Sequence, residues 1–326
     1  MQTRRSHVKS LAAGALALVT GRSFAQDDKS AITILVGAAS SMDFTARVIA
    51  DQLREVLGRP AIVVSKLGAG QRVALGEVKR AQPDGRTLVY ATSGPFAIYP
   101  HIYTKLDYDP VTDFTPIAGV STFDVAVATN PQTTGAQTLM QMVQWARARK
   151  PGDATFGSAP GNGSLSHFVG ISIGLATGVQ LVHVPYKDSG VGIVDLAAGR
   201  LPMMITGLSP LVEMHKAGRI KLLAVSGDTR SPLVPEVPTL KEAGVNVSST
   251  TSTGLFGPAK MPPDLIKRLH DAVTPMLSNT GIQEKLAGQA MNVWPATPQE
   301  LADSLAMERR RFETLVKSSG YVREEA

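Results

Sequence analysis

Runs of apolar and β-branched residues alternate with longer amphipathic stretches in the first third of the chain. Strand candidates cover residues 32–36, 61–64 and 87–91, and helical patterns cover residues 43–57 and 70–80. The helical patterns repeat apolar residues every three or four positions, whereas the strand candidates are short and bounded by turn residues. Such alternation is typical of βαβ units around a largely parallel sheet.

A second set of the same units begins after Thr129-Asn130-Pro131. Its strand candidates cover 154–156, 181–184, 201–205 and 220–225, and its helical patterns cover 138–149, 191–198, 210–217 and a segment from Ser164 onward. An apolar segment at 254–257 and helical patterns over 263–277 and 298–318 end the chain. At about 150 residues per domain, 326 residues also favour two units. We therefore predict two α/β lobes, each with its own sheet.

Four turns that follow strand candidates are rich in Gly, Ser and Thr. They lie at residues 37–41, 92–94, 157–164 and 185–190. In open α/β sheets, ligands bind outside the carboxyl ends of the strands, and the free N–H groups at a helix start favour a carboxylate or phosphate. Each turn alone is equally well explained as a tight turn with a capping residue. Four of them at corresponding sheet ends favour a site for an anionic ligand.

Motifs of the common enzyme classes are absent from the sequence. Gly68-Ala69-Gly70 and Gly161-Asn162-Gly163 lack the third glycine of a dinucleotide fingerprint, and no phosphate loop, zinc helix or nucleophile elbow occurs. The chain has no cysteine, and its histidines show no metal-ligand spacing. We therefore predict no cofactor and no metal. Ser164 and His167, about one helical turn apart, leave a secreted serine hydrolase as an alternative.

The net charge of +6 comes mainly from the first 25 residues. Arg4, Arg5, Lys9 and Arg22 lie there without an acidic residue, so the rest of the chain carries 29 basic against 27 acidic residues. This balance gives no reason to expect a nucleic-acid partner.

Residues 1–25 also have the order of an export signal. The basic start is followed by nine uncharged residues from Leu11 to Val19, then by Ser23-Phe24-Ala25. Nine residues are too few to cross a bilayer core, and the small residues fit a cleavage site. We expect cleavage near Ala25 and a mature periplasmic protein. Arg4-Arg5 leaves the twin-arginine route open beside the favoured general secretory route.

A set of short motifs in a fixed order resembles the Bug family, the extracytoplasmic solute-binding subunits of tripartite tricarboxylate transporters. The resemblance covers essentially the whole mature chain. The motifs are Gly68-Ala69-Gly70, residues 81–88, Asp109-Pro110, residues 113–117, Phe156-Gly157-Ser158, Gly161-Asn162-Gly163-Ser164 with His167, residues 183–187, 223–226, Arg230-Ser231, residues 234–240 and Glu242-Ala243-Gly244.

The resemblance implies a type II periplasmic-binding-protein fold with two α/β lobes around a cleft for a small organic carboxylate. Lobe one would comprise residues 27–128 and 253–326, and lobe two residues 129–252. The protein would be a monomer that passes its ligand to the membrane subunits of a tripartite tricarboxylate transporter, without chemistry of its own. A periplasmic sensor for a two-component system remains a second possibility within this family.

The chain departs from the family pattern in the first loop and after the Tyr-Lys pair. Ala39-Ser40 replaces a glycine pair, and Asp188 replaces a glycine, either as a helix cap, which we favour, or as a partner for an amine or hydroxyl of the ligand. A Gly163→Val variant is expected to block the ligand and still fold. The predicted ligand-binding residues are Ala39, Ser40, Thr92, Ser93, Ser158, Gly161, Asn162, Gly163, Ser164, His167, Tyr186, Asp188 and Thr206.

Overall fold

The computed structural model describes residues 30–38 and 41–325, so the predicted export signal lies outside the described residues. Its strands are β1 (Ile32–Val36), β2 (Ala61–Ser65), β3 (Thr87–Thr92), β4 (Phe114–Thr129), β5 (Thr155–Ser158), β6 (Val182–Pro185), β7 (Met203–Gly207), β8 (Lys221–Val225), β9 (Thr250–Pro258) and β10 (Met291–Val293).

Helices follow most of the strands, as the alternating pattern predicts. The α-helices are α1 (Ser41–Leu57), α2 (Arg72–Lys79), α3 (Gly94–Ala97), α4 (Tyr99–Ile102), α5 (Pro131–Thr134), α6 (Leu139–Arg147), α7 (Leu165–Thr177), α8 (Ser189–Ala197), α9 (Ser209–Lys216), α10 (Pro263–Val273), α11 (Thr280–Gly288) and α12 (Pro298–Ser319). Short 3₁₀ turns, η1 (Ala69–Gln71) and η2 (Thr274–Ser278), precede α2 and follow α10.

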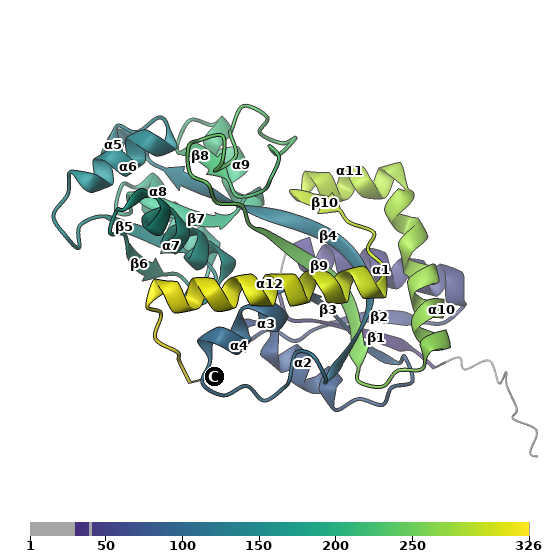
Figure 1. Ribbon diagram of the computed structural model, residues 1–326. Helices are drawn as coiled ribbons and strands as arrows, with labels where there is room; N and C mark the ends of the chain where they lie inside the picture. Colours follow the sequence, from purple (N-terminus) through teal and green to yellow (C-terminus); the bar gives the residue numbers. More distant parts are fainter. Residues whose placement is uncertain (1–29, 39–40, 326) are drawn as a thin grey trace, which may run out of the picture.

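One long strand joins the two predicted sheets. The order β2-β1-β3-β9-β4-β7-β5-β6 is continuous, and β8 and β10 also pair with β4. The βαβ pairs are parallel as predicted, whereas β4 runs antiparallel to β9, β7, β8 and β10. The prediction of two separate sheets is therefore wrong, because β4 belongs to both halves (Figure 1).

Register shifts bracket the middle of β4. Against β9 they fall between Pro116 and Ala118 and between Gly119 and Ser121, and against β8 between Val127 and Ala128. From Ser121 to Asp124 the pairing with β9 runs without a shift. The centre of β4 is thus held in a defined register where it passes between the halves of the molecule.

Buried apolar residues form separate clusters on the two sides of this crossing. Phe123 packs against the cluster that contains Ile34, whereas Val125 belongs to the cluster that contains Phe156. We call the side built on β1–β3, β9, β10 and the first half of β4 the first lobe. The side built on β5–β8 and the second half of β4 is the second lobe. A smaller cluster of α3, α4, α7 and α12 side chains lies between the two lobes, where Phe312 packs against Phe168.

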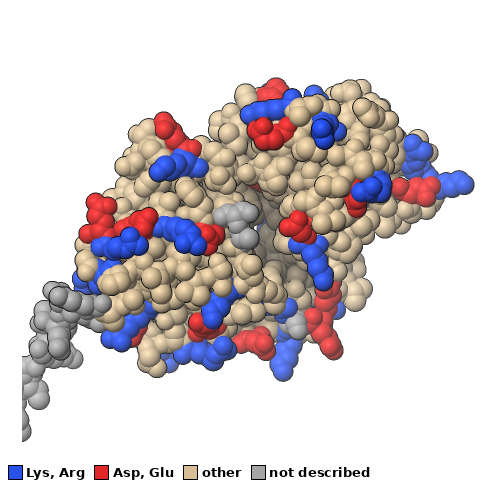
Figure 2. Space-filling model, turned by 180° about the vertical axis from the view of Figure 1, so that it is seen from behind, with Lys and Arg blue, Asp and Glu red and all other residues tan. Residues whose placement is uncertain are grey.

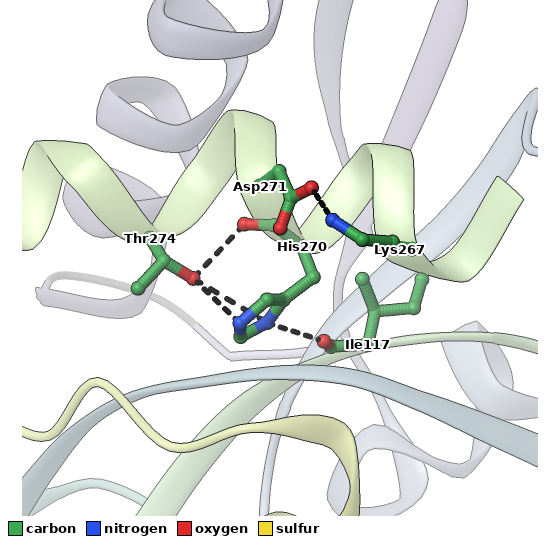
Figure 3. A network of polar contacts seen from close by, with 5 residues as sticks. All are labelled: Ile117, Lys267, His270, Asp271 and Thr274. Atoms are coloured by element: carbon green, nitrogen blue, oxygen red, sulfur yellow. Dashed lines mark hydrogen bonds and ion pairs between the residues drawn. The ribbon is translucent and has the colours of Figure 1, made fainter. Parts of the chain in front are cut away.

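Helix α10 is fixed to the first lobe through His270 (Figure 3). The His270 Nδ1 atom lies 3.1 Å from the carbonyl oxygen of Ile117 in β4, and the Thr274 hydroxyl donates to the His270 carbonyl at 2.9 Å. Lys267 and Asp271 form an ion pair one helical turn apart on the exposed side. The buried face of α10 therefore has a specific polar contact to the strand that joins the lobes.

Candidate ligand-binding site

A cavity of about 620 Å³ lies between the two lobes. Residues just beyond the carboxyl ends of β1, β3, β5, β6 and β7 line it, where the sequence predicts the ligand. The middle of β4, the start of β9 and the side of α12 complete the wall. Figure 2 shows the hollow from behind. Its volume suits a small molecule.

The lining mixes apolar and polar side chains but holds no Lys, Arg or His side chain among the described residues. Three acidic side chains, Asp124, Asp188 and Glu308, are present. A carboxylate in this cavity would therefore depend on hydroxyl and backbone N–H groups instead of an ion pair. The hydroxyl groups in the lining include those of Thr92, Ser93, Ser164, Ser166, Ser189 and Thr206.

Gln71 organises the first-lobe side of the cavity. Its side-chain Nε2 donates to the Thr92 hydroxyl at 2.6 Å, and its Oε1 accepts from the Thr92 N–H at 3.2 Å. Because the Thr92 hydroxyl accepts from Gln71, its own hydrogen remains available to a ligand. Ser93 is buried beside it. Ala39 and Ser40, the predicted residues of the first loop, lie outside the described residues.

The start of α7 forms the second-lobe side. The Ser164 hydroxyl oxygen caps the helix by accepting from the His167 N–H at 3.1 Å, and the first intrahelical bond runs from the Phe168 N–H to the Ser164 carbonyl. The N–H groups of Leu165 and Ser166 precede that bond and have no acceptor inside the helix. Both residues line the cavity, so the positive end of the α7 dipole is available to an anion.

The starts of α8 and α9 complete this side. The Asp188 carboxylate accepts from the Gly190 N–H at 2.7 Å, which confirms its predicted role as a helix cap. The Ser189 and Thr206 hydroxyl oxygens lie 2.8 Å apart. Thr92, Ser93, Gly163, Ser164, Asp188 and Thr206 are thus the predicted residues that the structure brings together around the cavity.

Other predicted residues support the wall from behind and do not line it. The Ser158 hydroxyl lies 2.7 Å from the His183 Nε2, and the Gly161 carbonyl accepts from the Ser158 and Ser164 hydroxyls. The Asn162 amide donates to Glu324 at 3.1 Å, and the Tyr186 hydroxyl donates to Asp195 at 2.9 Å.

His167 is also behind the wall, stacked on His183 with ring centroids 3.7 Å apart. Its Nδ1 accepts from the Gly163 N–H at 3.2 Å. Burial, and then the neighbouring His183, lowers the pKa of His167 to about 3, and burial lowers the pKa of His183 to about 4. The Ser164 hydroxyl donates to Gly161 and makes no side-chain bond to His167 in the described structure. Ser164 and His167 therefore lack the nucleophile–base contact that the hydrolase alternative requires of this pair.

Gly163 is a poor position for a blocking substitution. Its φ is +68°, a left-handed conformation that favours glycine, and an added Cβ would lie 2.1 Å from the Ile102 Cδ1. The expectation that Gly163→Val folds normally therefore conflicts with the structure. Gly207 also lines the cavity, and an added Cβ there meets no atom within 4 Å.

Sequence reasoning missed Gln71, Asp124 and Glu308 in the lining. Burial, and then the charge of Asp228, raises the pKa of Asp124 to about 6, and burial raises the pKa of Glu308. An aspartate inside the apolar run 123–128 was the available signal for Asp124. Across residues 30–38 and 41–325, no cluster of three metal-ligating side chains and no helix suited to span a membrane is found.

A family model described as the tripartite tricarboxylate transporter family receptor matches residues 45–321. The chain belongs to this receptor family. The match confirms the prediction from the sequence motifs, which resemble those of the Bug family. Two curated relatives are a UPF0065 protein of Bordetella bronchiseptica, 30% identical over 88% of this chain and 84% of the relative, and the protein BugT of Bordetella pertussis, 28% identical over 86% of each.

Solved structures of similar receptors confirm the two-lobe α/β fold. Rpa4515 of R. palustris with adipate is 26% identical, with a TM-score of 0.82 over 91% of this chain and 99% of that chain. MatC from Rhodopseudomonas palustris with bound malate is 27% identical, with a TM-score of 0.76 over 88% and 99%. A structure described as a periplasmic transporter is 30% identical, with a TM-score of 0.80 over 90% and 99%.

Proposed function

We propose that this receptor binds a small organic carboxylate in the cavity between its lobes and delivers it to a tripartite tricarboxylate-type transporter. The observation that carries the proposal is that Leu165 and Ser166, whose N–H groups have no acceptor inside α7, line the cavity. Adipate and malate, the ligands named for two similar structures, are small carboxylates. The proposed cellular site is the periplasm, after cleavage near Ala25.

The ligand carboxylate would accept hydrogen bonds from the Leu165 and Ser166 N–H groups and from nearby hydroxyls. Each charge-assisted bond contributes roughly 1.5–3 kcal/mol. We further propose that the lobes close about the middle of β4 and the segment leading into β9, near the Asp124 and Thr250 pair, and that the protein acts as a monomer. Closure would exclude water and strengthen these bonds.

A Gly207→Val variant tests the location of the site. The added side chain enters open space beside the cavity and suits a strand, so the ligand-free protein should keep its melting temperature within about 2 °C. Affinity for a carboxylate that binds the wild type should fall at least about tenfold, which equals about 1.4 kcal/mol. Calorimetric titration measures the affinity, after a carboxylate library has been screened by melting shift.

Gly76→Val in α2 is the matched control. An added Cβ at Gly76 meets only the end of the Arg80 side chain, at 3.5 Å, and Gly76 does not line the cavity. Ligand at 100 times its Kd should stabilise the wild type and this control by about 2.7 kcal/mol. Equal affinity in Gly207→Val and Gly76→Val would place the ligand elsewhere. A library that shifts no melting temperature would contradict solute binding.

A further inference from the structure

Asp124 is a buried carboxylate at the cavity wall, and among residues 30–38 and 41–325 its Oδ1 has no hydrogen-bond partner. It lies in the middle of β4, opposite Thr250, and is 7% exposed. Its Oδ1 is buried and makes no hydrogen bond in the described structure, although Asp124 lines the cavity. Its carboxylate occupies the space where a side chain at position 227 would lie, because an added Cβ on Gly227 would be 2.4 Å from Oδ2.

The other acidic groups near the cavity already have partners. Asp188 caps α8 through Gly190, and Glu308 accepts from the Ser252 hydroxyl at 3.1 Å. Asp228, behind the wall, pairs with Lys241 at 2.6 Å. Asp124 therefore differs from its acidic neighbours in having an unsatisfied oxygen.

The charge of the lining decides what can satisfy that oxygen. A buried, unpaired carboxylate is costly, and an ionised carboxylate only accepts hydrogen bonds. The described lining supplies no cation, and its three acids would repel a second anionic group at this wall. A protonated amine supplies both the missing donor and the missing positive charge. A hydroxyl supplies only the donor.

We propose that Asp124 selects ligands that carry a protonated amine in addition to a carboxylate. The carboxylate lies at the start of α7 and the amine at Asp124, so the ligand class is that of small amino acids. This inference rests on the proposed function, since it assigns the second end of a ligand whose first end is the carboxylate.

Matched acids with and without an amine test the proposal. The probes are L-glutamate with glutarate, L-aspartate with succinate, and γ-aminobutyrate with butyrate, each titrated by calorimetry near pH 7.5. The wild type is expected to bind at least one amine-bearing acid at least tenfold more tightly than its partner. Asp124→Asn, which keeps the shape and removes the charge, should reduce that preference at least tenfold and leave the amine-free acid unchanged or tighter.

Asp228→Asn is the control for a general loss of negative charge, because Asp228 lies near Asp124 but outside the lining. It should change the preference less than threefold. If the amine-free acids bind the wild type as tightly as the matched amine-bearing acids, the proposal is overturned, while carboxylate binding still stands. If Asp124→Asn weakens the binding of both acids of a matched pair equally, the proposal is also overturned, in favour of a protonated Asp124 that donates to a ligand carboxylate. Failure of every probe and of the carboxylate library would overturn the proposed function itself.

Discussion

The two stacked histidines behind the start of α7 link the cavity wall to pH. His167 is 6% exposed, and its Nδ1 accepts the N–H of Gly163, a lining residue. A proton on Nδ1 would remove that acceptor and place a charge beside His183. The neutral imidazole is therefore part of how the α7 start is held.

The stability of the protein should fall on acidification because of His167. Its pKa is about 3 in the folded state, against about 6.5 unfolded, so between these values the unfolded chain binds a proton that the native protein does not. This contribution is fully present above pH 6.5. At pH 5 it is reduced by roughly 2 kcal/mol.

His167→Asn tests this effect, because the asparagine oxygen can still accept from Gly163 but does not titrate. Urea unfolding measures the free energy of unfolding at pH 7 and at pH 5. The drop between these two values should be about 2 kcal/mol smaller in the variant than in the wild type. The same loss in both proteins would contradict the assignment.

Local sequence predicts some of the residues around the cavity and not others. Ser164 and Asp188 were predictable because a capping side chain must lie where its helix starts. Asn162, His167 and Tyr186 are neighbours of the same loops, but their side chains point to other partners, which local sequence does not encode. Asp124 stands out in the apolar run 123–128, but its place at the cavity wall follows from the long-range pairing of β4, which local sequence does not encode.

At the scale of elements, the end of α12 connects to the second lobe. The Tyr321 ring packs on His167 and Phe168, with ring centroids 5.7 Å away in each case. Its hydroxyl donates to Glu324 at 2.6 Å, and Glu324 also accepts from Asn162. The segment after α12 thus contacts the helix that starts at the cavity.

Tyr321→Ala should destabilise the protein by about 2 kcal/mol, because the half-buried ring loses its packing. Tyr321→Phe keeps the ring and loses only a hydrogen bond, so its cost should stay below about 1 kcal/mol. Denaturant titrations of the two variants and the wild type measure the loss in the free energy of unfolding that each substitution causes. Equal losses would indicate that the hydroxyl, and not the ring, fixes the segment.

Among the elements, β4 was beyond local prediction, whereas β1, α1 and most βαβ units were close to their predicted bounds. The segment of β4 contains Pro116, Gly119 and Asp124, and its apolar residues do not alternate cleanly. Its length follows from pairing with β9 on one side and with β7 and β8 on the other. Such long-range pairing overrides local propensity.

At the scale of the whole molecule, the shared strand and the bridging helix couple the lobes. β4 contributes to the cores of both lobes, and α12 packs on α3 and α4 of the first lobe and on α7 of the second. Neither lobe keeps its complete sheet without β4. The two lobes should therefore lose their structure together.

Scanning calorimetry of the ligand-free protein tests this coupling. One transition is expected, with calorimetric and van't Hoff enthalpies that agree. Two resolved transitions, or a calorimetric enthalpy well above the van't Hoff value, would show that the lobes unfold independently.

The undisturbed pairing at the centre of β4 also limits how the chain can vary in length. Strand side chains alternate between faces, so one residue inserted or deleted between Ser121 and Asp124, with the pairing of the first half of β4 kept, would turn Asp124 from the cavity to the opposite face of the strand. The bulges near Pro116 and Val127 already absorb irregularity on either side. Insertions and deletions should therefore be tolerated in the loops beyond both ends of β4, while its central segment accepts only substitutions.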